Sequence, residues 1–243
     1  MDYLDFAGKA VLVVGGSSGI GNAIAQTFRA AGGDVHVWGT RASTVDYAGE
    51  PASDLGGLAY AQVDVGAAGA VEAYVPPFDR LDVVVLSQGI VLGGGEMTEE
   101  GFRRVIEVNL ISLMACAVKF HAMLKASGGS LIVIGSSAAF HATPDAPAYN
   151  ASKTGALGLT RTLARAWAED GIRVNGIAPG YVPTRLNAAM MANPERRTAA
   201  LERIPLGRFG TPEEMARIAL FLASPLASYV VGQTLLADGG MLL

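Results

Sequence analysis

KAVLVVGGSSGIG, residues 9–21, joins a short apolar run to a glycine-rich turn. The run, residues 9–14, is typical of a strand that is covered on both faces of a parallel sheet. Apolar residues then recur at the spacing of one buried helix face, at Ile24, Ala25, Phe28 and Ala31. Strand, glycine turn and helix in this order predict a phosphate-binding turn, because glycines admit a pyrophosphate and the helix start offers free N–H groups. A tight turn that binds no ligand is the alternative.

Apolar runs of strand length recur along the chain and alternate with helical patterns. They span residues 35–38, 58–63, 82–86, 130–134, 172–177 and 234–237. This alternation predicts an α/β fold with a single Rossmann-type, doubly wound parallel sheet of about seven strands. No internal repeat or linker is visible, so one domain is expected over residues 1–243.

Two stretches carry no strand pattern. Residues 42–57 show no clear periodicity. Residues 181–211 form the longest excursion without a predicted strand and include Pro183, Pro194 and Pro205. Long excursions of this kind are often lids, so we expect a substrate loop near residues 181–211.

The composition of the chain argues against nucleic-acid-binding, membrane-spanning and disulfide-rich proteins. The chain is 51% hydrophobic and 16% charged, which predicts that some of its surface is buried between subunits. A net charge of −4 without a basic run argues against nucleic acid, and no uninterrupted apolar run reaches the length of a membrane helix. The single cysteine, Cys116, excludes a disulfide framework, and the N-terminus lacks the basic residues of a secretion signal. We therefore expect a cytoplasmic enzyme that acts without a membrane, nucleic acid or a metal site.

The segment from Ser136 to Lys153 carries residues suited to proton transfer. Tyr149 and Lys153 are four positions apart on a predicted helix, so they lie on one face, one turn apart. A neighbouring lysine favours the phenolate, which predicts a lowered pKa for Tyr149 and proton exchange with a carbonyl or an alcohol. Ser136 follows the run 130–134, where an α/β sheet presents groups to a ligand. An exposed polar helix face is the alternative interpretation of Tyr149 and Lys153.

These motifs, taken in order, resemble the short-chain dehydrogenase/reductase family over essentially the full length. The glycine turn at 15–21, Asp64-Val65, PGYVPT at 179–184 and ADGG at 237–240 are similar to motifs of that family. The resemblance extends to its catalytic tetrad, in the form of Asn109, Ser136, Tyr149 and Lys153.

The resemblance implies a role for each member of the tetrad. Tyr149 would be the general acid/base, and Ser136 would hold the substrate oxygen. Lys153 would lower the pKa of Tyr149 and bind the nicotinamide ribose, while Asn109 would hold a water that relays protons. Counting back thirteen positions from Tyr149 selects Ser136, whereas Ser137 fits only if the loop is one residue shorter than usual.

The resemblance also implies which residues contact a nicotinamide cofactor. They are Gly15, Ser17, Ser18, Gly19, Ile20, Gly21, Thr40, Arg41, Asp64, Val65, Ser87, Gln88, Gly89, Tyr149, Lys153, Pro179, Gly180, Val182 and Thr184.

Three positions depart from the family pattern. Val14 stands where a threonine is usual, and Leu86 stands where that threonine's asparagine partner is usual. Replacing both members of a buried hydrogen bond with apolar groups can be nearly neutral, so these two departures compensate each other. Gln88 is bulkier than the usual alanine and would either alter nicotinamide placement or contact the substrate.

The residues after the second predicted strand bear on cofactor choice. An acidic residue at its end would select NAD by binding the ribose 2′-hydroxyl, but Gly39 stands at that position. Thr40 and Arg41 follow, and arginine is suited to bidentate phosphate contacts. We therefore expect NADP, with NAD as the alternative. Arg41 would otherwise be a solvated loop charge.

Together these features predict an NAD(P)-dependent oxidoreductase that interconverts a secondary alcohol and a ketone by hydride transfer. A non-catalytic cofactor-binding sensor or scaffold is the alternative, and an isomerase or dehydratase with recycled cofactor is a third. A mostly apolar set of residues predicts a mainly apolar pocket and substrate, with plain packing as the alternative; they are Phe140, His141, Tyr181, Val182, Met190 and Met191. The resemblance implies a homotetramer that pairs through the helices around Asn109 and after Tyr149, and through the last strand.

Overall fold

Seven strands form one parallel sheet in the order β3-β2-β1-β4-β5-β6-β7. The computed structural model describes residues 3–243. The strands are β1 (Ala10–Val14), β2 (Asp34–Gly39), β3 (Ala59–Gln62), β4 (Val83–Leu86), β5 (Ser130–Ile134), β6 (Arg173–Pro179) and β7 (Thr234–Ala237). The predicted fold class is confirmed, and every predicted strand boundary lies within two residues of the observed one.

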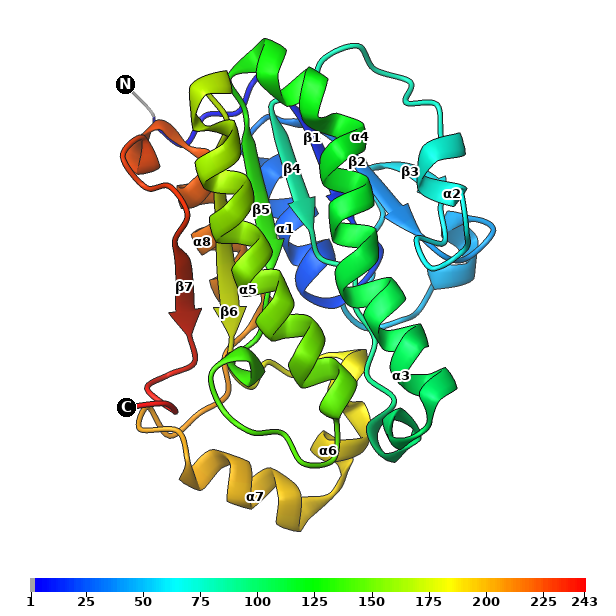
Figure 1. The fold of residues 1–243 in the computed structure, drawn as a ribbon, viewed down its shortest axis with the longest axis vertical. Coiled ribbons are helices and arrows are strands. Elements are labelled where there is room, and N and C mark those ends of the chain that lie inside the picture. Colours follow the sequence, from blue (N-terminus) through cyan, green and yellow to red (C-terminus); the bar gives the residue numbers. More distant parts are fainter. Residues whose placement is uncertain (1–2) are drawn as a thin grey trace.

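Helices cover both faces of the sheet (Figure 1). Helices α1 (Gly19–Ala30) and α8 (Pro212–Ala223) lie behind it, and their apolar faces pack around Ile24 and Phe28. Helices α2 (Ala70–Ala73), α4 (Ser112–Ser127) and α5 (Pro147–Trp167) pack on the opposite face, around Phe120 and Leu124. Central strands are therefore buried on both sides, which explains their continuous apolar sequences.

The strand order reverses between β1 and β4, which are neighbours in the sheet. Connections leave these two strands toward opposite faces, so a crevice opens outside their carboxyl ends. The glycine turn follows β1 and Ser87-Gln88-Gly89 follows β4. The topology thus places both segments at the crevice.

A long helix carries Asn109. Helix α3 (Glu99–Ile106) begins after the N-cap residue Thr98, whose side chain accepts a hydrogen bond from the Gly101 N–H. It continues through a π-helical turn (Glu107–Ile111) into α4. By length and composition alone, the joined 29-residue helix is long and apolar enough to cross a membrane. Its inner face packs on the sheet around Phe120 and Leu124, as in a core helix.

The segments without predicted strands contain none. Between β2 and β3 only a 3₁₀ turn (Thr44–Tyr47) forms, and the following chain is held beside α1, where Asn22 Nδ2 donates to the Asp54 carbonyl at 2.7 Å. After β6, residues 181–211 contain a 3₁₀ turn (Arg185–Asn187), α6 (Ala188–Ala192) and α7 (Pro194–Glu202). These last helices lie beyond the carboxyl ends of the strands (Figure 1).

Candidate active site

Ser136, Tyr149 and Lys153 come together at the carboxyl end of β5. Ser136 has extended backbone, with φ −166°, and its hydroxyl oxygen accepts a hydrogen bond from the Ala138 N–H at 3.1 Å. Tyr149 and Lys153 lie in the first turns of α5, as predicted. The side chain of Lys153 is buried, and its Nζ donates to the Ile134 carbonyl at 2.9 Å. A strand end and a helix start thus hold the three side chains.

The pKa of Tyr149 is set mainly by burial. Burial raises it, hydrogen bonding to Ser136 offsets part of the rise, and the negative charge of Glu96 raises it further. Lys153 Nζ lies 5.6 Å from the Tyr149 ring centroid and is directed to the Ile134 carbonyl. The expectation that Lys153 lowers the pKa of Tyr149 is therefore wrong for this geometry. Burial also lowers the pKa of Lys153 itself, to about 8.

The structure separates the two adjacent serines. Ser136 is partly exposed and shares a hydrogen bond with Tyr149, whereas Ser137 is buried. The carbonyl of Ser137 lies 3.0 Å from His141 Nδ1, within the turn that follows β5. Of the two alternatives, Ser136 is the one placed beside Tyr149.

Asn109 is fully buried in the π-helical turn, a feature that often marks functional sites. Its Oδ1 accepts from the Ile90 N–H at 2.8 Å, and its Nδ2 donates to the Ile90 carbonyl at 2.9 Å. Nδ2 also donates to Ser152 Oγ at 3.2 Å. The amide therefore ties the segment after β4 to α5. A Cβ on Gly89 would lie 3.5 Å from Lys153 Nζ and 3.6 Å from Asn109 Oδ1, so this glycine lies between the two side chains.

The glycine turn is suited to an anionic group. Gly19 has φ +57°, and its N–H donates to the Ala52 carbonyl at 2.8 Å. Within the described chain, no residue accepts a hydrogen bond from the N–H of Ile20 or Gly21 at the start of α1. Two unpaired donors at a helix N-terminus fit a diphosphate. Ser18 precedes them as the N-cap residue without using its side chain as a cap.

Close backbone packing explains the other glycines of the turn. A Cβ on Gly15 would lie 2.9 Å from the Gln88 backbone, and one on Gly21 would lie 2.3 Å from the Gly15 carbonyl oxygen. Ser87 Oγ lies 3.1 Å from the same position on Gly21. The ends of β1 and β4 and the start of α1 are therefore in direct contact.

Gln88 directs its amide into the protein. Its Nε2 donates to Ser112 Oγ in α4 at 2.9 Å, and Ser112 in turn donates to the Val108 carbonyl. Its Oε1 has no hydrogen-bond partner among residues 3–243. The sequence had suggested that this side chain reaches the nicotinamide or the substrate; instead it packs against α4, and only its backbone borders the turn.

The end of β2 is shaped by Tyr47, which the sequence did not single out. A Cβ on Gly39 would lie 2.5 Å from the Tyr47 hydroxyl and 2.7 Å from Ser17 Oγ. A larger side chain therefore cannot occupy position 39 without displacing the buried Tyr47. Tyr47 lies in the stretch 42–57, which lacks any periodic pattern, so nothing in the sequence indicated its role.

Arg41 is held by its neighbours rather than solvated. Its guanidinium lies 4.6 Å from the Tyr47 ring centroid and forms an ion pair with Glu50. The other oxygen of Glu50 lies 3.5 Å from Arg185 NH1, so one carboxylate connects the β2–β3 segment with the substrate loop. Thr40 is exposed, and its carbonyl accepts from Gln62 Nε2 at 3.1 Å.

The remaining predicted cofactor residues lie around the same crevice. Asp64 follows β3, where Oδ1 accepts from the Gly66 N–H at 2.9 Å, and Val65 is partly buried. Pro179 ends β6 and Gly180 follows; Val182 is buried, and Thr184 caps the 3₁₀ turn of the substrate loop. A Cβ on Gly19 would lie 3.3 Å from Thr184 Cγ2, so this loop reaches the glycine turn.

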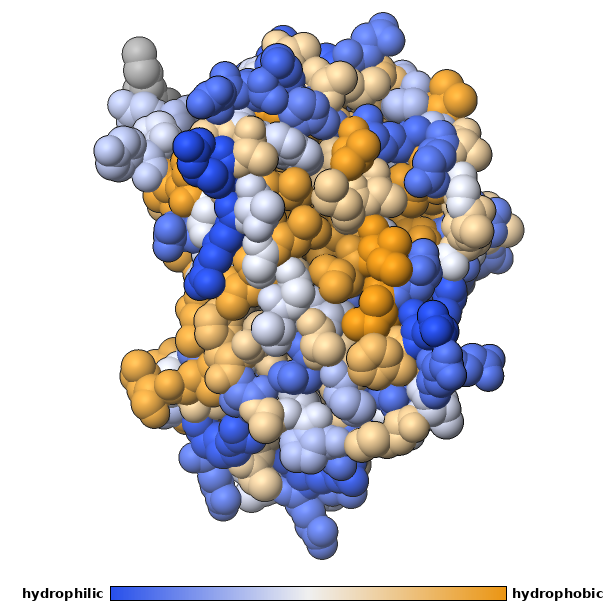
Figure 2. Space-filling model, in the orientation of Figure 1, coloured by the Kyte–Doolittle hydropathy of each residue, from blue (hydrophilic) through white to orange (hydrophobic). Residues whose placement is uncertain are grey.

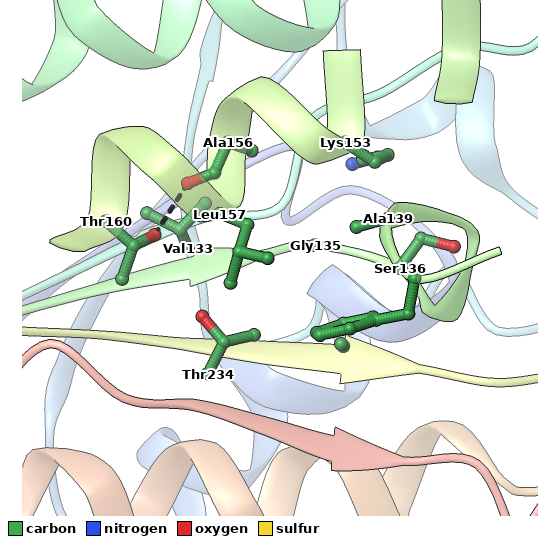
Figure 3. A pocket seen from close by; sticks show the side chains of 11 residues that line it. Val133, Gly135, Ser136, Ala139, Lys153, Ala156, Leu157, Thr160 and Thr234 are labelled. Carbon is green, nitrogen blue, oxygen red and sulfur yellow. Dashed lines mark hydrogen bonds between the residues drawn. The ribbon is translucent and has the colours of Figure 1, made fainter. Parts of the chain in front are cut away.

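Ser136 and Lys153 also line a small cavity between β5 and α5 (Figure 3). Its walls are apolar, with Val133, Ala156 and Leu157, and Thr160 and Thr234 lie at the end away from Ser136. The Thr234 hydroxyl is buried without a hydrogen-bond partner among the described residues. The polar side chains of the candidate active site therefore lie at one end of this cavity, the two threonines lie at the other, and apolar side chains line the space between them.

Comparison with known proteins identifies the family. Residues 14–242 match the model of a family described as enoyl-(acyl carrier protein) reductase. The chain is 38% identical over 246 residues to a 3-oxoacyl-(acyl-carrier-protein) reductase FabG of Chlamydia pneumoniae, with 98% of both sequences covered. It belongs to the short-chain dehydrogenase/reductase family. Members of this family are NAD(P)-dependent oxidoreductases, and so is this chain.

Other relatives show how widely this short-chain dehydrogenase/reductase pattern is used. A 3beta-hydroxysteroid dehydrogenase 1 of Eggerthella lenta is 38% identical over 253 residues, covering 99% of this chain and 96% of the relative. Among solved structures, a putative 2-deoxy-d-gluconate 3-dehydrogenase of Agrobacterium tumefaciens with bound NADP superposes with a TM-score of 0.88 and 35% identity. That comparison covers 100% of this chain and 99% of the other. Similarity of this kind shows the enzyme class and leaves the substrate open.

Proposed function

We propose that this enzyme interconverts a secondary alcohol and a ketone with NADP, and that Tyr149 is its general acid/base. The observation that carries the proposal is the group formed by Tyr149, Ser136 and the buried Lys153 at the carboxyl end of β5. The raised pKa of Tyr149 keeps the phenol protonated, so it is ready to donate a proton to a carbonyl oxygen.

The chain's own residues orient and protonate the substrate. The hydroxyl of Ser136 would hold the substrate oxygen next to the phenol of Tyr149. Lys153 lies one turn further along α5, and Asn109 holds the Ile90 segment that borders the same space. When bound, the nicotinamide supplies the hydride, and the protein's share is orientation and electrostatics.

The residues present fit a dinucleotide diphosphate. The unpaired N–H groups of Ile20 and Gly21 would hold the phosphates, and the Thr184 segment lies against the same turn. Arg41 supports NADP over NAD, because its guanidinium is suited to binding a 2′-phosphate. Gly39, at the end of β2, provides no carboxylate to bind the 2′-hydroxyl of NAD. The bound NADP of the Agrobacterium tumefaciens relative supports the same choice.

Replacing Tyr149 with phenylalanine tests the acid/base role. Tyr149→Phe removes the transferable proton and should lower turnover at least about a hundredfold, with little change in NADPH affinity. Turnover would be followed by NADPH absorbance with a ketone or alcohol found by screening. Ser136→Ala should also lower turnover, while Ser137→Ala provides the matched control. Turnover of Tyr149→Phe within a few-fold of the wild type would remove Tyr149 from the mechanism.

We further propose the substrate class, the cellular location and the assembly of the enzyme. Its named relatives are a 3-oxoacyl-(acyl-carrier-protein) reductase, a 3beta-hydroxysteroid dehydrogenase and a putative 2-deoxy-d-gluconate 3-dehydrogenase, which supports a small-molecule substrate. We infer that the substrate is mainly apolar. Phe140 lines the cavity beside Ser136 and supports that inference. The chain would form a single NAD(P)-binding domain. Its residues 181–211 would close over the substrate. We place the enzyme in the cytoplasm as a homotetramer.

A further inference from the structure

Glu96 is a buried carboxylate that the acid/base chemistry does not use. It lies in a 3₁₀ turn (Gly93–Met97) between β4 and α3, and only 1% of it is exposed. Its Oε1 accepts a hydrogen bond from the Leu92 N–H at 2.9 Å, and its Oε2 accepts one from the Tyr149 N–H at 2.8 Å. None of the ion pairs formed within residues 3–243 includes Glu96. A buried charge of this kind is costly unless it is well hydrogen-bonded, so its retention calls for a reason.

The carboxylate takes the place of a missing helix cap. Helix α5 starts after Ala146, which has no side chain able to cap it, and Pro147 has no N–H to offer. Tyr149 is the third residue of the helix, and its N–H is one that an N-cap side chain normally satisfies. Glu96 satisfies this N–H from a segment fifty-three residues earlier, at the end of the helix dipole that favours a negative charge.

Both backbone polar groups of Tyr149 are thereby held. Its N–H binds Glu96, and its carbonyl accepts from Ser152 Oγ at 2.7 Å. The Ser152 hydroxyl oxygen also accepts a hydrogen bond from the side-chain amide of Asn109. The same amide accepts a hydrogen bond from the N–H of Ile90, the residue at the start of the segment that carries Glu96. The segment from 90 to 97 is therefore anchored at both ends to the helix that bears Tyr149.

We propose that Glu96 is a positioning residue, which fixes the backbone of Tyr149 at the start of α5 and places a negative charge next to this residue. Two charged side chains lie near Tyr149: Glu96 binds its backbone N–H at 2.8 Å, and Lys153 Nζ lies 5.6 Å from the centroid of its ring. Of the two, Glu96 acts on the phenol in the direction of a higher pKa. The effect of Glu96 on the reaction rate rests on the proposed acid/base role of Tyr149. The effects of Glu96 on the backbone and on the titration of Tyr149 do not depend on that role.

Titration of Tyr149 is the direct test. The protein would be labelled with carbon-13 at the tyrosine ring carbon that bears oxygen, and Tyr149→Phe would assign the signal. Glu96→Gln removes the charge, so the midpoint of the Tyr149 titration should fall by on the order of one pH unit. Glu96→Asp keeps the charge and should leave the midpoint close to that of the wild type. Glu99→Gln, on the exposed face of α3, is the matched control and should change nothing. An unchanged midpoint in Glu96→Gln would overturn the electrostatic part of the proposal.

Amide exchange tests the positioning part. The aspartate side chain is one methylene shorter and cannot reach both N–H groups, so Glu96→Asp should speed exchange of the Tyr149 amide at least about tenfold. This variant also keeps the test available if Glu96→Gln does not fold. Exchange at the wild-type rate would overturn the positioning role.

The pH dependence of alcohol oxidation links both effects to catalysis. The reaction needs the phenolate, so its rate rises with pH through the pKa of Tyr149. Glu96→Gln should move this rising, acidic limb toward lower pH, whereas a merely loosened site would lower the rate equally at every pH. If the limb does not move in Glu96→Gln while Tyr149→Phe is inactive, the result contradicts only the role of Glu96. An active Tyr149→Phe contradicts the proposed function, while the titration and exchange experiments still judge Glu96.

Discussion

At the scale of single residues, we propose that Arg41 and Glu50 decide how strongly the enzyme favours NADP. The guanidinium of Arg41 is already paired with the Glu50 carboxylate and stacked over Tyr47. A 2′-phosphate would therefore compete with Glu50 for the same donors. The affinity for NADPH then reflects the difference between two ion pairs rather than the gain of a new one.

Substitution of these two residues separates their contributions. Arg41→Ala should weaken NADPH binding by about 1.5–3 kcal/mol, the range for hydrogen bonds to charged groups, and leave NADH almost unaffected. Glu50→Gln should strengthen NADPH binding, because it frees Arg41. Fluorescence titration of both cofactors checks these outcomes. A wild type that prefers NADH, or an Arg41→Ala variant that loses both cofactors equally, would contradict the assignment.

At the scale of elements, β1 and β4 are joined by an apolar contact where the family has a hydrogen bond. Val14 and Leu86 are partners in the register of the two strands, both are buried, and both lie in the core beneath α4. The predicted pair therefore meets in the structure. An apolar pair at this point keeps the crevice floor packed without a polar group to satisfy.

A double-mutant cycle measures this contact. Val14→Thr alone buries an unpaired hydroxyl and should lower the free energy of unfolding by about 1–3 kcal/mol. Adding Leu86→Asn should recover much of the loss, since the two side chains can then bond to each other. Val13→Thr combined with Leu86→Asn is the control, because Val13 lies in the core on the opposite face. Strictly additive losses in the Val14 and Leu86 cycle, measured by denaturant unfolding, would show that the two residues do not interact.

At the scale of the whole molecule, apolar side chains gather on the outer face of α4 (Figure 2). Ile111, Met114 and Val118 are spaced along one stripe and are 49%, 41% and 57% exposed. Strand β7 adds a second exposed region, since it is the edge of the sheet and Leu236 points outward. A stripe on a helix and an open sheet edge support two different contacts between copies, as a tetramer of closed symmetry requires.

Light scattering at micromolar concentration tests the assembly. We expect four copies of the chain for the wild type. Val118→Glu places a charge in the α4 stripe and should yield smaller assemblies, whereas Val75→Glu, on a loop residue that is 83% exposed, should leave the tetramer intact. A monomeric wild type would contradict the proposal.

Local pattern in the sequence was enough to predict the fold, whereas most members of the candidate site were proposed from the resemblance to a known family. Continuous apolar runs mark strands buried on both faces, and glycines at 15, 19 and 21 mark a turn where backbones touch, because these properties depend on neighbours a few residues away. The spacing from Tyr149 to Lys153 follows from helix geometry in the same way. For this reason the predicted strands agree with the observed sheet to within two residues at each end.

Only the tertiary structure decided the electrostatics of the site. The pKa of Tyr149 is raised where the sequence predicted a fall, because burial outweighs a lysine that is directed elsewhere. The partners Glu96 and Glu50 come from segments without periodic patterns, and Gln88 packs against α4 rather than facing the cofactor side. Burial and charge pairing depend on residues that are distant along the chain and adjacent only after folding, so no local pattern could have revealed them.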